Sequence, residues 1–251
     1  MAAGSLDLPV VDLASPDLQS AAEAVRKACV DSGFFYVTNH GIQDQLVAAV
    51  FAESKKFFEL PLEEKMLLHR NSAHRGYTAP YDEKLDASSK FRGDLKESFY
   101  IGTVRDVDMQ NDPNQWPPEG EVNESDNGNY GASAHSDYGM ITLLATDGTP
   151  GLQICREKDK EDWKDVHHIE GALIVNIGDL LERWTNSVFR STLHRVVSVG
   201  KERYSAAYFL DPNPDLVVQC LESCCCEAYP PRFPPIKAGD YLKERLSATY
   251  K

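Results

Sequence analysis

From Ile141 onward the chain is a succession of short apolar runs separated by turns, and this pattern limits the fold more than any other feature. Gly, Asp or Pro lies in the turns between the runs, which are 141–145, 152–155, 172–177, 194–199 and 204–210. Several short strands at such spacing are typical of a β-sandwich or jelly roll. The second half of the chain is therefore predicted to form two packed sheets.

The first third mixes strand and helix signals. Residues 8–12 form an apolar run typical of an opening strand, and residues 34–37 favour a second strand. Ser15 and Pro16 predict a helix N-cap followed by proline at the first helical position. A second helix is predicted over 44–58 from its apolar spacing. We therefore expect a mainly β fold with flanking helices, in the α+β class.

The charge balance excludes some partners. Asp and Glu number 39 against 26 Lys and Arg, for a net charge of −13. Because this charge repels phosphate backbones and anionic lipid, we expect no nucleic acid and no membrane partner. No run of eighteen apolar residues predicts a membrane span, and no secretory leader is recognisable, so we expect a cytoplasmic protein. The residues carry no prediction of oligomeric state.

The cysteines favour a reducing compartment. Three of the six are consecutive, over Cys224–Cys226, which suits neither a disulfide ladder nor a zinc ribbon. Reduced thiols are typical of cytosolic and nuclear proteins. Packing is the favoured interpretation of the run, and a metal role is the minor alternative.

A candidate metal site follows from three residues. His135 and Asp137 are two residues apart before a predicted strand, and His194 begins another. Alternate residues of a strand point to the same side, so the first two can face one point. Two histidines and one carboxylate form the ligand set of non-haem Fe(II) oxygenases, which leaves metal positions open. An H-x-D motif alone is a weak signal, with a surface loop as its ordinary explanation.

A second pair strengthens the interpretation. Arg203 and Ser205 are also two residues apart, nine residues beyond His194. An Arg guanidinium donates two parallel hydrogen bonds to a carboxylate, and a neighbouring hydroxyl adds a third. Taken alone, an Arg on a strand is usually solvated or paired within the protein.

The chain resembles the plant-type Fe(II)/2-oxoglutarate-dependent dioxygenases, the isopenicillin N synthase-like family. The resemblance covers nearly the whole chain in order, through the triad and several further segments. These are residues 8–13 (LPVVDL), 33–41 (GFFYVTNHG), 57–65 (FFELPLEEK), 176–179 (NIGD) and 191–196 (STLHRV).

The resemblance implies a double-stranded β-helix core in which His135, Asp137 and His194 bind Fe(II). It also implies that Arg203 and Ser205 hold the distal carboxylate of 2-oxoglutarate. With O2, such an enzyme converts 2-oxoglutarate to succinate and CO2 while it hydroxylates or oxidises a small organic substrate. We expect no catalytic residues beyond the metal ligands.

We expect one domain over 1–251, with three regions. These are an N-terminal α/β region (1–105), a jelly-roll core with the metal site (131–237) and a C-terminal helix (238–251).

One segment departs from the family. Members carry a long helix and at least one core strand between Trp116 and the H-x-D motif. Here only residues 117–130 separate Trp116 from Gly131, and they are polar and rich in turn residues. A helix of about 20 residues spans about 30 Å, and a strand adds about 5–6 residues, so both cannot fit. The chain is therefore predicted to be a deletion variant, joined between Glu121 and Asn129.

A lost strand exposes the edge of its neighbour and part of the apolar interior. This predicts weak metal binding, low stability or inactivity. The alternative function is accordingly a catalytically impaired isoform that binds only metal, ligand or partner. A smaller departure is Ser187 after Asn186, where members commonly carry Gly. A positive φ there would cost serine roughly 1 kcal/mol.

Two other classes stay open on the residues alone. A β-sandwich interaction domain could carry the triad by accident, although the ordered motifs argue against it. A zinc hydrolase could use the same three ligands, but no clear general base accompanies them.

Overall fold

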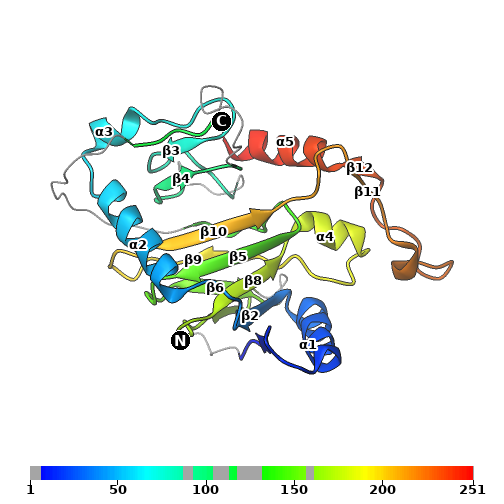
Figure 1. Cartoon of the computed structure of the whole chain (residues 1–251). Coiled ribbons are helices and arrows are strands. Elements are labelled where there is room, and N and C mark those ends of the chain that lie inside the picture. The colour runs from blue at the N-terminus through cyan, green and yellow to red at the C-terminus, as the bar shows by residue number, and fades with distance from the viewer. Residues whose placement is uncertain (1–6, 87–92, 104–112, 118–131, 157–160, 251) are drawn as a thin grey trace.

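Two β-sheets face each other around an apolar core in the computed structural model, which describes residues 7–86, 93–103, 113–117, 132–156 and 161–250 (Figure 1). One sheet has five strands in the order β1-β2-β8-β5-β10, and the other has three in the order β7-β6-β9. The strands of these sheets are β1 (Val10–Asp12), β2 (Phe34–Thr38), β5 (Ile141–Thr146), β6 (Leu152–Cys155), β7 (Trp163–Asp165), β8 (Leu173–Ile177), β9 (His194–Val196) and β10 (Ser205–Leu210). The predicted mainly β architecture with two packed sheets is confirmed.

Helices and two small hairpins surround the sheets. In Figure 1, α1 lies against the five-stranded sheet near β2, while α3 and the β3-β4 pair lie beyond its β10 edge. The β11-β12 pair packs against α4 through Val218, while the loop between these two strands, which contains the short 3-10 helix η2, projects away from the body. These elements are α1 (Leu18–Asp31), α2 (Asp44–Phe58), α3 (Leu62–Met66), α4 (Asp179–Trp184), α5 (Ala238–Thr249), η2 (Glu222–Cys224), β3 (Gly76–Thr78), β4 (Ser98–Tyr100), β11 (Val217–Val218) and β12 (Ile236–Lys237).

The five-stranded sheet is apolar on both faces, which is why β2 and β8 are almost fully buried. One face packs on α1 through residues such as Phe35, Val175 and Cys29. The opposite face packs on the three-stranded sheet through Phe34, Ile174 and Ile154 among others. Alternate residues of each strand therefore serve two cores, as the period of two requires.

The start of α1 corrects one expectation. Ser15 and Pro16 do not begin the helix; Asp17 is the N-cap and the helix starts at Leu18. The Asp17 carboxylate accepts a hydrogen bond from Ser20 N at 3.0 Å, and from Ser20 Oγ at 2.6 Å. An aspartate satisfies a free helix N–H better than a residue two positions earlier can. The other predicted helices lie where expected, within a few residues at their ends.

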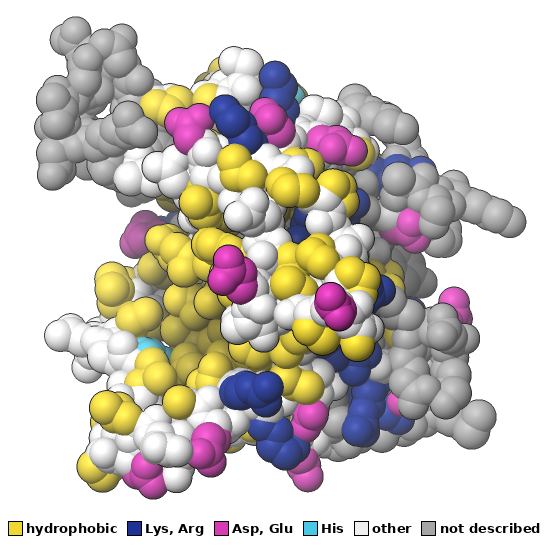
Figure 2. All heavy atoms as spheres, turned by 90° about the vertical axis from the view of Figure 1, so that its right-hand side faces the viewer, with side chains coloured by type: hydrophobic (Ala, Val, Ile, Leu, Met, Phe, Trp, Pro, Cys, Tyr) yellow, Lys and Arg dark blue, Asp and Glu magenta, His cyan; other side chains and the backbone are white. Residues whose placement is uncertain are grey.

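The last strand of the five-stranded sheet, β10, is the most exposed strand of the core. Within the described residues it pairs with β5 alone. Tyr208, Phe209 and Leu210 are 62%, 47% and 42% exposed. Figure 2, seen from the right-hand side of Figure 1, also shows hydrophobic side chains gathered around a hollow on that face. The fold thus leaves considerable apolar surface uncovered. Among the described residues, no helix is both long and apolar enough to cross a bilayer.

Candidate metal centre

The three predicted ligands come together at one end of the two sheets. His135 and His194 pair as an isolated antiparallel bridge, in which each backbone N–H donates to the other residue's carbonyl, at 2.9 and 2.8 Å. Asp137 follows two residues later, just before β5. The β-bridge thus brings His194 of β9 beside the H-x-D segment, as expected for a histidine on a neighbouring strand.

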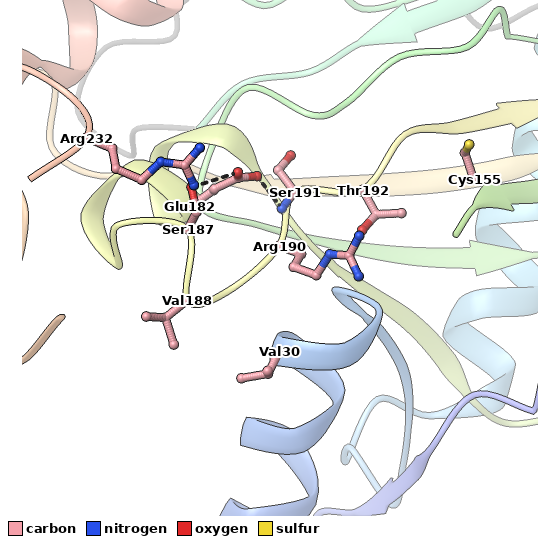
Figure 3. Close-up of a pocket in the computed structure, with 9 residues that line it drawn as sticks. All are labelled: Val30, Cys155, Glu182, Ser187, Val188, Arg190, Ser191, Thr192 and Arg232. Carbon is pink, nitrogen blue, oxygen red and sulfur yellow. Dashed lines mark hydrogen bonds between the residues drawn. The ribbon is translucent and has the colours of Figure 1, made fainter. Parts of the chain in front are cut away.

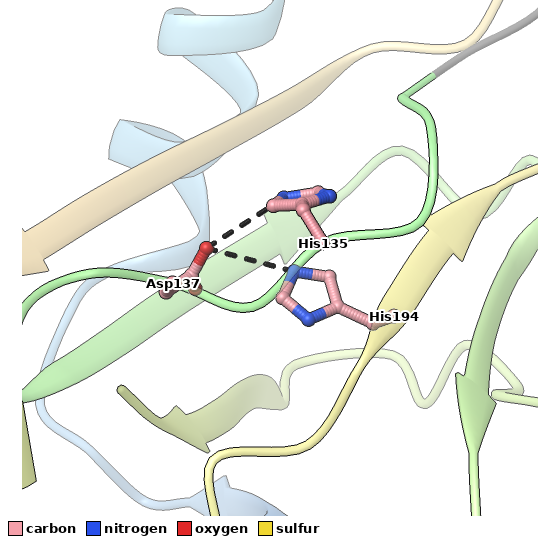
Figure 4. Close-up of side chains that lie close together, drawn as sticks. All are labelled: His135, Asp137 and His194. Atoms are coloured by element: carbon pink, nitrogen blue, oxygen red, sulfur yellow. Dashed lines mark ion pairs between the residues drawn. The ribbon is translucent and has the colours of Figure 1, made fainter. Parts of the chain in front are cut away.

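The side chains converge on one point (Figure 4). Asp137 Oδ1 lies 3.7 Å from His135 Nε2 and 3.6 Å from His194 Nε2. The three ligand atoms all lie within 4.8 Å of one another, and no other such group of His, Cys, Asp and Glu is found among the described residues. Two atoms that each bind one ion at about 2.1 Å can be up to about 4.2 Å apart. Both distances to Asp137 meet that limit.

The histidine rings are oriented by backbone carbonyls. His135 Nδ1 lies 2.7 Å from the Ser133 carbonyl oxygen, and His194 Nδ1 lies 3.2 Å from that of Thr192. A carbonyl oxygen only accepts, so Nδ1 carries the proton in each ring. In the neutral tautomer that this fixes, Nε2 carries the lone pair on the side that faces Asp137, as a metal ligand needs.

Asp137 is oriented by two buried donors. Its Oδ2 accepts hydrogen bonds from Thr142 Oγ1 at 2.5 Å and from Asn176 Nδ2 at 2.7 Å. Thr142 lies on β5 and Asn176 lies opposite it on β8. With Oδ2 occupied, Oδ1 is the oxygen that faces the histidines.

The pKa shifts of His135 and Asp137 favour the protonation states in which these side chains bind a metal. Burial and the nearby His194 lower the pKa of His135 to about 3, which Asp137 only partly opposes. Burial by itself would raise the pKa of Asp137, but the two histidines and the donors Asn176 and Thr142 together lower it. A neutral His135 and an ionised Asp137 at neutral pH are the forms that coordinate metals.

Ser205 lies on the same face of the sheet as the triad. The register places Ser205 opposite Thr146 and Phe209 opposite Thr142, and cross-strand partners share a face. Since Thr142 contacts Asp137, this is the face on which the triad lies. Ser205 is four residues from Phe209 along β10, roughly 14 Å at the usual rise of a strand.

Arg203 lies directly before β10. Its Nε donates to the Thr149 carbonyl at 3.3 Å, and burial lowers its pKa while Asp147 partly opposes this. Neither Arg203 nor Ser205 forms a hydrogen bond or ion pair with the triad in the part of the chain that the structure describes.

A cavity of about 590 Å³ lies apart from the triad (Figure 3). Glu182 is among its polar lining residues, and its carboxylate accepts hydrogen bonds from Ser187 Oγ at 3.1 Å and from Ser191 N at 2.6 Å. Arg190 also lines it and donates to the Asp31 carbonyl at 3.0 Å. These groups are bonded within the protein, and none of the triad lines the cavity.

Sequence reasoning missed the two donors to Asp137. Asn176 stands in the NIGD segment, which was recognised as a motif without a role, and Thr142 is one residue among several in an apolar run. Only the pairing of β5 with β8 brings them together. The sequence signal that could have indicated this role was the presence of one polar residue inside each of two otherwise apolar strands.

Two family models match the chain. The model described as the N-terminal region of non-haem dioxygenases in morphine synthesis matches residues 8–119, and that of the 2OG-Fe(II) oxygenase superfamily matches residues 110–212. Azadirone synthase of Melia azedarach is 36% identical, over 97% of this chain and 93% of its own length. A 2-oxoglutarate-Fe(II) type oxidoreductase of Emericella nidulans is 31% identical, over 91% of this chain and 84% of its own.

A solved structure agrees with these matches. A full-length protein of Neurospora crassa, solved in complex with alpha-KG, superposes with a TM-score of 0.81 at 28% identity, over the whole of both chains. The match to azadirone synthase runs over 311 aligned positions, whereas this chain has 251 residues, so at least 60 positions of that relative have no counterpart here. This agrees with the predicted shortening, although the join expected between Glu121 and Asn129 lies outside the described residues.

Proposed function

The chain belongs to the 2OG-Fe(II) oxygenase superfamily, and from that premise we propose that His135, Asp137 and His194 hold its Fe(II). The enzyme is an Fe(II)/2-oxoglutarate-dependent dioxygenase by family. We propose further that Arg203 and Ser205 bind the distal carboxylate of 2-oxoglutarate.

The donor set fits the metal. Two imidazoles and one carboxylate, converging from one side, form the facial arrangement that non-haem Fe(II) oxygenases use. The observation that carries the proposal is the orientation of these three side chains. Both Nδ1 atoms and Asp137 Oδ2 are occupied by protein partners, so both Nε2 atoms and Oδ1 are turned to the shared point.

The same sheet face offers a place for the co-substrate. A dicarboxylate lying along β10 would have one carboxylate at the metal and the other at Arg203 and Ser205. Arg203 is half-buried, its Nε donates to the Thr149 carbonyl, and the nearby Asp147 favours its charge. Among the described residues no carboxylate forms an ion pair with it, so the N–H groups of its fork can be offered to a carboxylate ligand.

When bound, Fe(II), 2-oxoglutarate and O2 supply the oxidation, in which 2-oxoglutarate becomes succinate and CO2 and the substrate is hydroxylated or otherwise oxidised. The protein's own residues orient the reactants. His135, Asp137 and His194 fix the metal, Thr142 and Asn176 keep Asp137 in place, and Phe34 packs its ring against His194 at a centroid distance of 5.5 Å.

The proposed substrate is a small organic molecule, as the names of relatives such as azadirone synthase suggest. These relatives favour an oxygenase over the alternative of an isoform that only binds ligand or partner. We keep the single domain with its regions 1–105, 131–237 and 238–251 as a proposal. A cytoplasmic location is likewise proposed, because no disulfide joins any of the six cysteines.

The co-substrate assignment is tested with Arg203→Lys. Loss of the forked contact should raise the KM for 2-oxoglutarate roughly 10–100-fold in succinate-release assays. Arg195→Lys is the matched control, because Arg195 follows His194 on β9 and instead bonds Gln153 and packs on Trp163. An unchanged KM in Arg203→Lys, or an equal rise in both variants, would refute the assignment.

A further inference from the structure

Four of the six cysteines lie within seven residues of one projecting loop, between β11 and β12 (Figure 1). They are partly or fully exposed, whereas the other two cysteines of the chain are buried. The metal centre uses none of them. Because oxidation of a thiol requires access, these four are the ones open to an oxidant. The exposed set is Cys220, Cys224, Cys225 and Cys226.

Two of the four thiols converge on a single carbonyl oxygen. Cys220 Sγ lies 3.4 Å from the Leu221 oxygen, and Cys225 Sγ lies 3.6 Å from the same atom. The two sulfurs are therefore at most 7.0 Å apart. Cys225 Sγ also lies 3.9 Å from the Glu222 carbonyl oxygen, on the same turn.

The local backbone explains why these two meet. Residues 222–224 form the one turn of η2, which carries the chain back toward Cys220. Cys225 is then extended, with φ −143° and ψ 159°, so its side chain points away from those of its two neighbours. Cys224 Sγ instead contacts Ser223 Oγ at 3.8 Å.

The loop is held in this form from both sides. Leu221 N donates to the Trp184 carbonyl at 2.9 Å, which fixes the loop to the end of α4. Cys226 and Tyr229 exchange two backbone hydrogen bonds, each of 3.0 Å. The approach of Cys220 to Cys225 thus belongs to an anchored loop.

We propose that Cys220 and Cys225 form a reversible disulfide when the protein meets a two-electron oxidant such as hydrogen peroxide. One thiolate attacks a peroxide oxygen and becomes a sulfenic acid as hydroxide leaves. The other thiolate attacks that sulfur, the S–S bond forms, and a second hydroxide leaves. With the two thiol protons, the products are one disulfide and two waters.

The reaction should become faster as the pH rises. Partial burial and the neighbouring thiol of Cys225 raise the pKa of Cys220, so this thiol is largely protonated at neutral pH. Since the thiolate is the nucleophile, a higher pH increases the reactive fraction.

The test uses the whole protein, treated with hydrogen peroxide while folded and then alkylated and cut with trypsin. The tryptic peptide 204–232 holds all four exposed cysteines. In the wild type, two of its four thiols should escape alkylation, with the loss of two hydrogens, and a thiol reductant should restore all four.

Two double variants identify the pair. Cys224→Ser with Cys226→Ser retains the proposed pair and should still form the bridge. Cys220→Ser with Cys225→Ser retains the other two cysteines and should not form it. The reverse result, or a bridge that forms equally fast in protein unfolded before oxidation, would overturn the proposal.

Discussion

His135 and His194 stand 59 positions apart in the chain, yet each donates its backbone N–H to the other's carbonyl oxygen. The bridge sets the separation of the two rings through the main chain, so it does not depend on either imidazole. Either histidine side chain can therefore be substituted while the backbone pairing of residues 135 and 194 is kept.

Thr142 should control metal affinity through Asp137. Thr142→Val keeps the shape of the side chain but removes the donor to Asp137 Oδ2. Outer partners of metal ligands typically contribute 10–100-fold in affinity, so we expect Fe(II) binding to weaken by roughly that factor. Anaerobic titration with Fe(II), without 2-oxoglutarate, measures the change.

Thr146→Val is the control for that experiment. Thr146 lies four residues along the same strand on the same face, but its hydroxyl bonds His168 instead of Asp137. Its Fe(II) affinity should match the wild type. Equal affinities in both variants would show that Asp137 does not need the Thr142 hydroxyl.

Glu83 should make the stability of the fold depend on pH. It is 3% exposed, contacts Lys96 Nζ at 2.5 Å, and accepts hydrogen bonds from Tyr250 at 2.7 Å and Tyr100 at 3.1 Å. Burial by itself would raise the pKa of Glu83, but Lys96 and the two tyrosines outweigh it and lower the pKa below 4.5. The stabilisation is therefore present above about pH 4.5 and is lost as the pH falls through the folded-state pKa.

Urea unfolding of Glu83→Gln checks this. At neutral pH the free energy of unfolding of the variant should be about 3 kcal/mol lower than that of the wild type, because Lys96 is left without its partner. Below pH 4.5 the difference in free energy of unfolding between the two proteins should become smaller, because Glu83 of the wild type is then protonated as well. Glu53→Gln, which alters an exposed pair with Lys56, should follow the wild-type curve. A constant difference at all pH values would contradict the role given to Glu83.

Glycine at position 187 should remove the backbone strain of the turn after α4. Asn186 and Ser187 have φ of 54° and 64°, so the positive φ expected for this turn is confirmed. Ser187→Gly and Ser187→Ala both lose the hydroxyl bond to Glu182, and they differ only in the Cβ atom. We expect the glycine variant to be more stable by about 1 kcal/mol in thermal or urea unfolding. An alanine variant of equal stability would show that the turn carries no strain.

The exposed strand β10 should promote self-association. An apolar strand at a sheet edge is a template for pairing with another chain. Tyr208→Lys should lower the association seen by sedimentation or light scattering as concentration rises. Leu67→Lys, which changes a 78% exposed residue directly after α3 and outside β10, should have little effect. Association that is insensitive to Tyr208→Lys would exclude β10 as its cause.

The sequence was most informative where chemistry and strand periodicity coincide. His135, Asp137 and His194 were predicted as one site from strand alternation together with the ordered family motifs, and the structure brings them together. Thr142 and Asn176 were not assigned a role, because their contact with Asp137 depends on the register of β5 against β8. Tertiary register is not encoded in a local pattern.

Element ends and very short strands were predicted less well. Ser15 was predicted as the N-cap, but the N-cap is Asp17. Both residue types are good caps and they lie close together, so the residue at which the backbone becomes helical determines which of them caps the helix. Strands β11 and β12 have two residues each, too few for any periodicity to be visible.

Anaerobic titration of the protein with Fe(II) and 2-oxoglutarate tests the central claim most directly. We predict the weak visible charge-transfer band of an Fe(II)–2-oxoglutarate chelate, its loss in folded His194→Ala, and its retention in His69→Ala, which changes an exposed histidine paired with Asp82. A band that persists without the His194 imidazole, or that never forms in folded wild-type protein, would contradict the assignment of His135, Asp137 and His194 as the iron ligands.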